Sequence, residues 1–367
     1  GFPLDLTETI LAEHKIELDQ EEFEKEMEKQ KALSKKNSSF KAQKDNLKIF
    51  YQIKEEFGGT PYLGDNHDSF EAKLIAQETI NNQTYLVFDK TPFYPESGGQ
   101  IGDTGLIMKD GHSLVSIIDT QRPVDDLIVH ITERPVTLEL GNIYQLSIDV
   151  QRRRFIRKNH TATHLLQAAL RQILGPHIKQ AGSSVDSKRL RFDFTHSEPL
   201  TEEQCEKIES LVNEVISKSI TPKASEMTKE EAHKLGAMAL FGEKYGNIVR
   251  VLQIDDFSIE LCGGTHVENT MNIGLFKIIH ETSLASGVRR IEAITSETAR
   301  NYLFTRSKIL HQLEKSLSIK EEQVLEKIYH LQQSPFSFVP ACKRMVSHAR
   351  PDASALGCCG RASRGLG

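Results

Sequence analysis

The chain has 367 residues, a formal net charge of −5 and a charged fraction of 26%. This length predicts two or three domains, and the acidic balance argues against indiscriminate binding to polyanions. No stretch is apolar and long enough to span a bilayer, and no segment has the pattern of a secretory signal. The five cysteines show no disulfide framework, which predicts a reducing, cytoplasmic location.

Residues 1–52 are predicted to be helical and strongly charged. Asp19 is a suitable N-cap for the run that follows it, and Phe23 and Met27 give that run a thin apolar stripe, which we interpret as a docking face. The charged positions are interpreted as solvated surface. Because the chain begins with Gly1 rather than Met, we expect it to be a fragment or a processed product.

Residues 53–150 change to short alternating segments separated by Gly, Pro, Asn and Asp. This pattern is typical of a small antiparallel barrel or sandwich, and we predict a β-barrel. The segment ESGGQIGDTG, residues 96–105, holds four glycines within eight positions. This density exceeds what a hairpin needs, and it indicates a backbone that a ligand can approach closely.

Residues 151–297 are predicted to form an α+β domain, because one long helical period is followed by strands and shorter helices. The long helix is predicted to end at Gly175 and Pro176. Thr201 with Gln204 forms a capping box that marks the start of a second helix.

The end of the chain divides into two predicted parts. Residues 298–333 have an amphipathic pattern that predicts a helix, interpreted as the start of a long stem. Residues 334–367 are rich in Pro, Ser, Gly, Arg and Cys without a period, which predicts a disordered, unmatched tail. A translation artefact at a gene boundary is the alternative interpretation. The predicted fold is therefore α+β and multidomain, with a helical N-terminal segment, an antiparallel β-barrel, an α+β domain with zinc, a C-terminal helix and the tail.

Four side chains predict a metal site. His160 and His164 lie four residues apart in the helical run NHTATHLL, so both imidazoles project from one face. Cys262 and His266 are separated by a glycine-rich turn that can fold both onto one ion. A lone His or Cys is more often ordinary structure, but a thiolate with three imidazoles suits Zn²⁺. Because Thr161 stands where HExxH has its glutamate, a zincin protease is disfavoured.

Six segments occur in the order GFPLDLT, FYPESGGQIGDTG, NHTATHLL, IKQAGSSVDSKRLRFDF, ALFGEKYG and CGGTHVENTMNIGLFKIIHETSLASGVRRIEAIT. In this order they resemble the editing domain of alanyl-tRNA synthetases and its neighbours, and the resemblance covers roughly residues 1–332. It implies that residues 1–52 end a helical tRNA-recognition region. It also implies that residues 151–297 hydrolyse serine or glycine from mischarged tRNA(Ala). The ATP-dependent aminoacylation domain would be missing, so we expect no activation of alanine.

The resemblance also implies roles for single residues. One set is expected to hold zinc: His160, His164, Cys262 and His266. Of these, Cys262 and His266 are expected to lie nearest the reacting ester as catalytic residues. Gln180 is expected to line the pocket and to act in catalysis, against the alternative of a surface-loop glutamine. Thr104 is a candidate for binding the serine hydroxyl, against a turn residue that bonds its own backbone.

Five basic residues directly precede the histidine pair: Arg152, Arg153, Arg154, Arg157 and Lys158. We expect them to bind substrate by attracting the phosphates of tRNA, which predicts salt-sensitive binding. A solvated helix flank is the alternative interpretation. Zinc could either activate water or only orient the ester, and the residues favour neither.

Other functions also fit this sequence. One is a zinc-stabilised tRNA-binding module without activity, and another is a free-standing factor that deacylates tRNA in trans. An unrelated zinc hydrolase would leave the barrel and stem motifs unexplained. The sequence predicts no oligomeric state.

Overall fold

The computed structural model describes residues 40–65, 67–238 and 247–333. They separate into two compact units at the boundary between Asn301 and Tyr302. The predicted helix after Asp19, the segment ALFGEKYG and the predicted tail lie wholly or largely outside the described residues.

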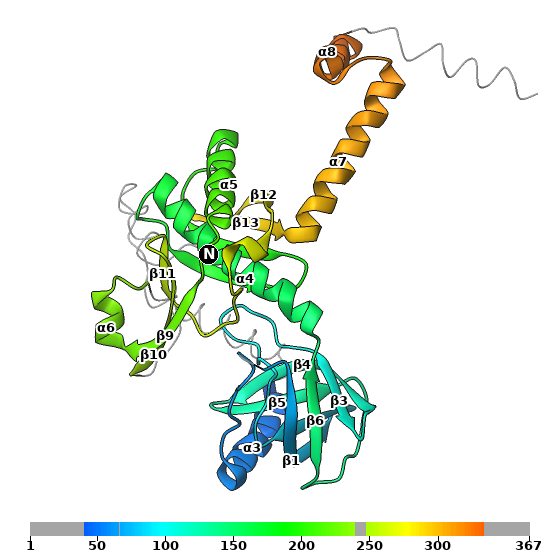
Figure 1. Cartoon of the computed structure of the whole chain (residues 1–367), viewed down its shortest axis with the longest axis vertical. Coiled ribbons are helices and arrows are strands. Elements are labelled where there is room, and N and C mark those ends of the chain that lie inside the picture. The colour runs from blue at the N-terminus through cyan, green and yellow to red at the C-terminus, as the bar shows by residue number, and fades with distance from the viewer. Residues whose placement is uncertain (1–39, 66, 239–246, 334–367) are drawn as a thin grey trace, which may run out of the picture. The chain divides into compact units, whose positions relative to one another are not determined.

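Six antiparallel strands close a barrel in the order β1-β2-β5-β4-β3-β6 (Figure 1), as the alternating pattern predicts. Side chains alternate between its two faces: Leu86 and Phe88 lie in the interior core, whereas Val87 packs outside. The strands are β1 Ser69–Ile80, β2 Gln83–Phe88, β3 Gly105–Lys109, β4 His112–Val124, β5 Leu127–Thr132 and β6 Ile143–Ile148.

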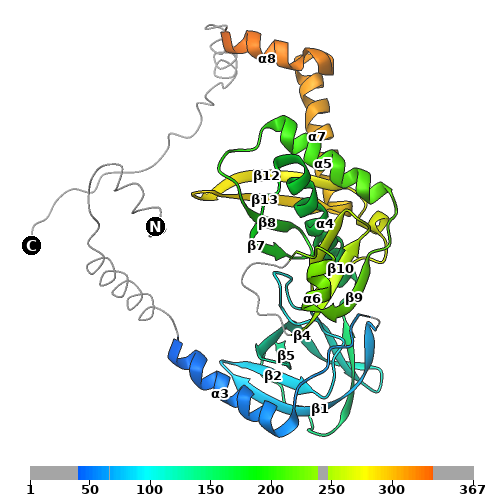
Figure 2. The same cartoon turned by 90° about the vertical axis from the view of Figure 1, so that its left-hand side faces the viewer.

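Helix α3, Phe40–Phe57, covers part of the outer face of the barrel (Figure 2). Phe50 and Ile53 are buried there against Val87 and Val129. The helix therefore continues five residues past the expected boundary at residue 52, because its apolar stripe is paired with barrel residues. Removing that apolar surface from water is what holds α3 on the barrel.

The α+β domain combines two sheets with two main helices. A four-stranded antiparallel sheet has the order β12-β13-β8-β7 (Figure 2), and a three-stranded one has the order β11-β10-β9 (Figure 1). The elements are α4 Val150–Leu174, β7 Gln180–Val185, β8 Leu190–Thr195, α5 Glu202–Ser217, β9 Lys223–Thr228, α6 Lys229–Lys234, β10 Ile248–Ile254, β11 Ser258–Leu261, η1 Thr270–Ile273, β12 Phe276–Ala285 and β13 Val288–Thr295.

Local signals set the ends of the helices in this domain. Asp149 caps α4 by accepting a hydrogen bond from the amide of Arg152. Gly175, at a φ of 120°, ends α4 as predicted. The predicted capping box of Thr201 and Gln204 is present at the start of α5. Strand β7 was not predicted, because its sequence QAGSSV has few strand-forming residues.

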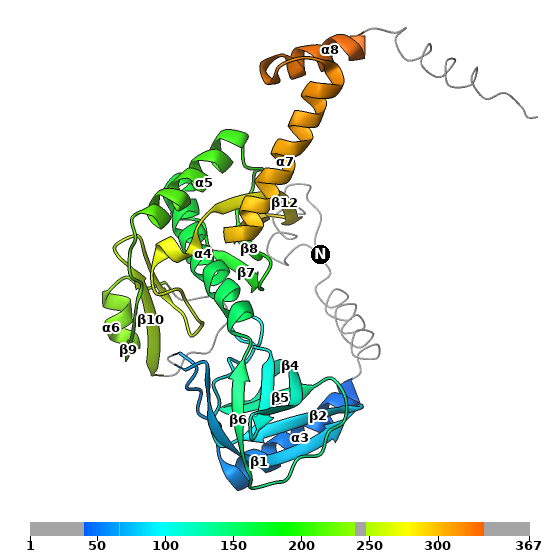
Figure 3. The same ribbon diagram turned by 45° about the vertical axis from the view of Figure 1, so that its right-hand side comes forward.

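A single residue separates barrel strand β6 from helix α4 (Figure 3), and Arg153 joins this helix to the segments before β1 and between β2 and β3. Its side chain is only 1% exposed. The guanidinium donates to the carbonyl oxygens of Gly64 and Pro92, each at 2.7 Å, and forms an ion pair with buried Asp103. The charge of Arg153 is therefore compensated inside the protein, and its role in substrate binding stays a prediction.

The second unit consists of the end of α7, Ser296–Leu317, with η2 Glu321–Gln323 and α8 Val324–Gln333. One continuous helix was expected over 298–333, but the structure breaks it after Leu317. Ser318 has a φ of 53°, a left-handed conformation that ends a helix. No helix among the described residues is long and apolar enough to cross a membrane.

Candidate metal centre

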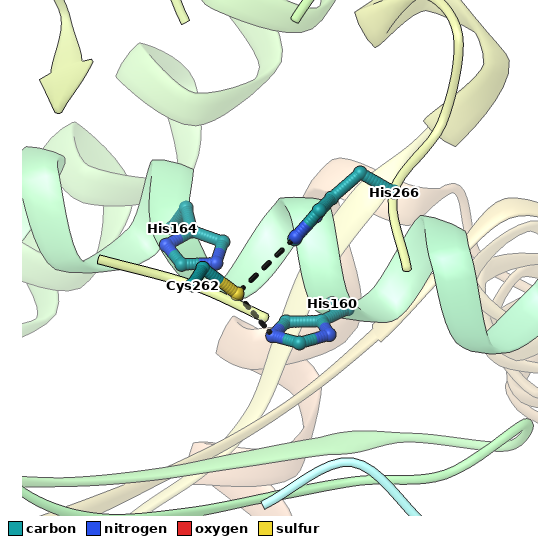
Figure 4. A group of neighbouring side chains, drawn as sticks. All are labelled: His160, His164, Cys262 and His266. Carbon is teal, nitrogen blue, oxygen red and sulfur yellow. Dashed lines mark hydrogen bonds between the residues drawn. The ribbon is translucent and has the colours of Figure 1, made fainter. Parts of the chain in front are cut away.

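The four predicted ligands come together in the structure (Figure 4). His160 and His164 project from one face of α4, and their rings are stacked 5.3 Å apart. Cys262 and His266 lie in the loop that follows β11. One ligand atom from each side chain lies within 4.8 Å of the others. The helical spacing and the glycine-rich turn therefore produce the cluster that they predict.

The spacing of the ligand atoms fits a metal ion. Cys262 Sγ lies 3.5 Å from His160 Nε2 and 3.3 Å from His266 Nε2. Tetrahedral coordination with the usual bond lengths of about 2.0–2.3 Å separates neighbouring ligands by about 3.4–3.7 Å. Nε2 of His164 is buried without any hydrogen-bond partner. Such an orphaned nitrogen is costly unless a cation occupies the space beside it.

Each imidazole is oriented through its Nδ1 atom. His160 Nδ1 donates to Gln100 Oε1 at 2.7 Å, and His164 Nδ1 donates to Glu260 Oε2 at 2.7 Å. His266 Nδ1 lies 3.3 Å from the hydroxyl of Thr161. That hydroxyl gives its own proton to the carbonyl oxygen of residue 157, so it can accept the one from His266. With Nδ1 engaged in this way, Nε2 is the atom that each imidazole can offer to a cation, and on His164 that atom must first release its proton.

Gln100 and Glu260 are functional residues that sequence reasoning missed. Gln100 lies in the glycine-rich barrel segment, where its Oε1 also accepts from the amide of Thr265 at 2.9 Å. Glu260 lies on β11 and is fully buried. The position of Gln100 inside ESGGQIGDTG was the available signal. Nothing in the sequence distinguishes Glu260 from other strand carboxylates.

Gly264 is required by the crowding of this centre. A Cβ atom at residue 264 would lie 2.0 Å from His160 Cε1 and 3.0 Å from Gln100 Oε1. Any side chain would therefore displace His160 or separate the loop from the barrel. The amide of Gly264 also donates to Cys262 Sγ at 3.4 Å.

The electrostatics of the cluster favour a thiolate. Burial alone would raise the pKa of Cys262, but the three histidines around it hold that pKa well below its usual value. Burial opposes the charged form of His164 too, yet Glu260 and Cys262 raise its pKa to about 10. Burial lowers the pKa of His266 to about 3. These neighbours therefore favour the thiolate form of Cys262, which is the form that binds a cation.

A cavity of about 250 Å³ lies beside the cluster. His266 is the only one of the four cluster residues among the described residues that line it. The other walls come from the first half of α4, from the segment between His266 and η1 together with η1 itself, and from Asp68 just before β1. This cavity gives a ligand access to the His266 side of the centre.

Only some of the other expected site residues line this cavity. Arg157 lines the cavity, whereas Arg152 donates to the carbonyl oxygen of Gly102 at 2.8 Å and so faces the barrel.

Gln180 lies on β7 and donates to the hydroxyl of Ser183. Thr104 accepts from the amide of Asp149 through its backbone carbonyl. Neither Gln180 nor Thr104 is among the lining residues.

Comparison with known proteins identifies the family. Residues 1–152 match the class II (A) tRNA synthetases, and residues 249–292 match the second additional domain of threonyl and alanyl tRNA synthetases. The chain is 44% identical to the alanine–tRNA ligase of Fusobacterium nucleatum over 89% of its own length. The chain belongs to the alanyl-tRNA synthetase family. The second match contains Cys262 and His266, whereas the histidine pair of α4 lies between the two matches.

Two further relatives extend this comparison within the family. The alanine–tRNA ligase of Petrotoga mobilis is 43% identical over 89% of the chain, and that of a Sulfurovum species is 42% identical over 97%. The chain spans only 38% of the Fusobacterium and Petrotoga enzymes and 41% of the Sulfurovum enzyme. Coverage of 97% extends into residues 334–367, and the predicted character of that segment stays a prediction.

Glu260 provides a test of the way the centre is built. Replacing Glu260 by Gln removes the charge that orients His164, and we expect the affinity for zinc to fall about 10–100-fold. Competition with a chromophoric chelator measures this affinity. The matched control is Glu203→Gln, because Glu203 is an exposed carboxylate at the start of α5. Equal zinc affinity in the Glu260 variant and the control would contradict the assigned role.

Proposed function

We propose that this chain carries the editing activity of its family: hydrolysis of the ester that joins serine or glycine to tRNA(Ala). The cluster of His160, His164, Cys262 and His266 carries the proposal, because its donor atoms are arranged for one cation. Three imidazole nitrogens and a thiolate favour Zn²⁺ over the hard cations Mg²⁺ and Ca²⁺. When bound, zinc supplies Lewis-acid polarisation and a fixed point for orienting an ester.

The chain's own residues supply the rest of the site. His266 forms the cavity wall where an ester meets the centre. Gln100, Thr161 and Glu260 keep the imidazole rings in position, so little reorganisation is needed when substrate binds. Gln180 and Thr104 are proposed contacts to the amino acid on the basis of the family resemblance. Cys262 lies deeper, at 4% exposure, where it anchors the loop that carries His266.

The selectivity follows from size. A synthetic site shaped for alanine rejects glycine weakly, since one methyl group contributes only about 1–3 kcal/mol. Serine is larger by one hydroxyl and is also rejected incompletely. A second site that hydrogen-bonds the serine hydroxyl can hydrolyse the wrong ester and spare alanine.

Deacylation of seryl-tRNA(Ala) and alanyl-tRNA(Ala) by the zinc-loaded chain tests the proposal. We expect the serine ester to be lost much faster than the alanine ester. One observation favours a second function: four protein ligands fill a tetrahedral shell, as in structural zinc sites. Tight binding of tRNA without loss of either ester would reject the editing proposal and establish a zinc-stabilised binding module.

A further inference from the structure

The cavity beside His266 has an unusual charge distribution. Four basic side chains and two acidic ones line it: Arg153, Arg154, Arg157, Lys158, Asp68 and Glu268. Arg153 is neutralised by Asp103, and Lys158 lies 3.5 Å from Glu297. Among the residues that the structure describes, no carboxylate forms an ion pair with Arg154 or Arg157. Two guanidinium charges are therefore available to a ligand.

The surroundings of these two arginines favour an anion. Nε of Arg157 is buried without a hydrogen-bond partner, and its Nη2 has only a long contact of 3.4 Å to the carbonyl oxygen of Asp65. Arg154 is exposed and lies one helical turn earlier on α4, so both side chains project from the same face. Planar guanidinium groups bind phosphate oxygens through paired, charge-assisted hydrogen bonds.

We propose that Arg154 and Arg157 bind the phosphodiester that precedes the 3′-terminal nucleotide of the tRNA. The inference rests on the proposed function and adds the orientation of the substrate: the terminal ribose and its ester then face His266. Asp68 and Glu268 are consistent with this ligand, because an aminoacyl ester also carries an ammonium group and ribose hydroxyls, which carboxylates bind.

Binding of a fluorescent CCA trinucleotide to the zinc-loaded chain, measured over a range of salt concentrations, tests the proposal. We expect the double variant Arg154→Ala/Arg157→Ala to bind several-fold more weakly. The slope of log K against log salt is negative, and its magnitude should decrease by about 0.7, the value for one contact to a single-stranded phosphate. The matched control Arg134→Ala, an exposed arginine outside the cavity, should keep the wild-type slope.

A second variant separates charge from folding. The pair Arg154→Lys/Arg157→Lys keeps both charges and is expected to retain the wild-type slope with reduced affinity. Wild-type slopes in the alanine variant would overturn the inference even if seryl-tRNA(Ala) were hydrolysed. Conversely, altered slopes together with no deacylation by the wild type would support the phosphate site and reject the editing function.

Discussion

Replacing Cys262 by Ala is expected to lower zinc affinity more than 100-fold and to abolish deacylation of seryl-tRNA(Ala). The sulfur is the negative member of the cluster, and it lies within 3.5 Å of two imidazole nitrogens. Losing an outer contact of a metal site already costs about 10–100-fold in affinity, so losing a ligand should cost more. Zinc content after gel filtration and the rate of release of labelled serine measure the two effects.

Cys205 is the matched control for this experiment. It is the other free cysteine among the described residues, and it lies half-buried on α5. Cys205→Ala should leave both zinc content and deacylation at the wild-type level. Full deacylation by the Cys262 variant would reject the assignment of Cys262 to the reacting centre.

Replacing Arg153 by Ala is expected to destabilise the protein by about 3–5 kcal/mol, because it leaves Asp103 as an uncompensated buried charge. Both side chains are 1% exposed. Two carbonyl oxygens of the barrel also lose their donor, which adds to the cost. Urea unfolding followed by circular dichroism measures the change in the free energy of unfolding.

The neighbouring residue gives a direct comparison. Arg154→Ala removes an exposed arginine one position along the same helix, and we expect the free energy of unfolding to change by no more than about 0.5 kcal/mol. The double variant Arg153→Met/Asp103→Leu should recover much of the lost stability, because neither charge is then buried alone. A loss below about 1 kcal/mol in Arg153→Ala would show that this pair does not fasten α4 to the barrel.

The parts of the site that depend on short-range patterns were predictable from the sequence. His160 and His164 meet because helical geometry places residues four apart on one face. Because the chain contains both this histidine pair and the pair Cys262 and His266, the sequence indicated that all four side chains bind one ion. The barrel was predictable for a similar reason, because short strand-like segments separated by turn residues follow one another along the chain, and alternation with period two is visible in strands such as β6.

The remaining features depend on tertiary contacts between distant residues. Glu260 and Gln100 support His164 and His160 across separations of 96 and 60 residues, and no local pattern encodes such pairs. Arg153 looks like its neighbours in the run QRRRFIRK, and only folding shows that it is buried. The run of basic residues therefore predicted the positive charge of this helix. It did not predict which of these side chains are buried and which can contact a ligand.

The barrel takes part directly in the arrangement of the cluster in the neighbouring domain. Gln100 reaches from the barrel and holds both His160 and the backbone of Thr265. Undocking the barrel would therefore release one of the four proposed ligands and the loop that carries two others. If a cation binds the cluster, thermodynamic linkage requires that its binding strengthens docking of the barrel by the same factor by which docking strengthens its binding. A substitution in the barrel, far from the cluster, would then weaken binding of the cation.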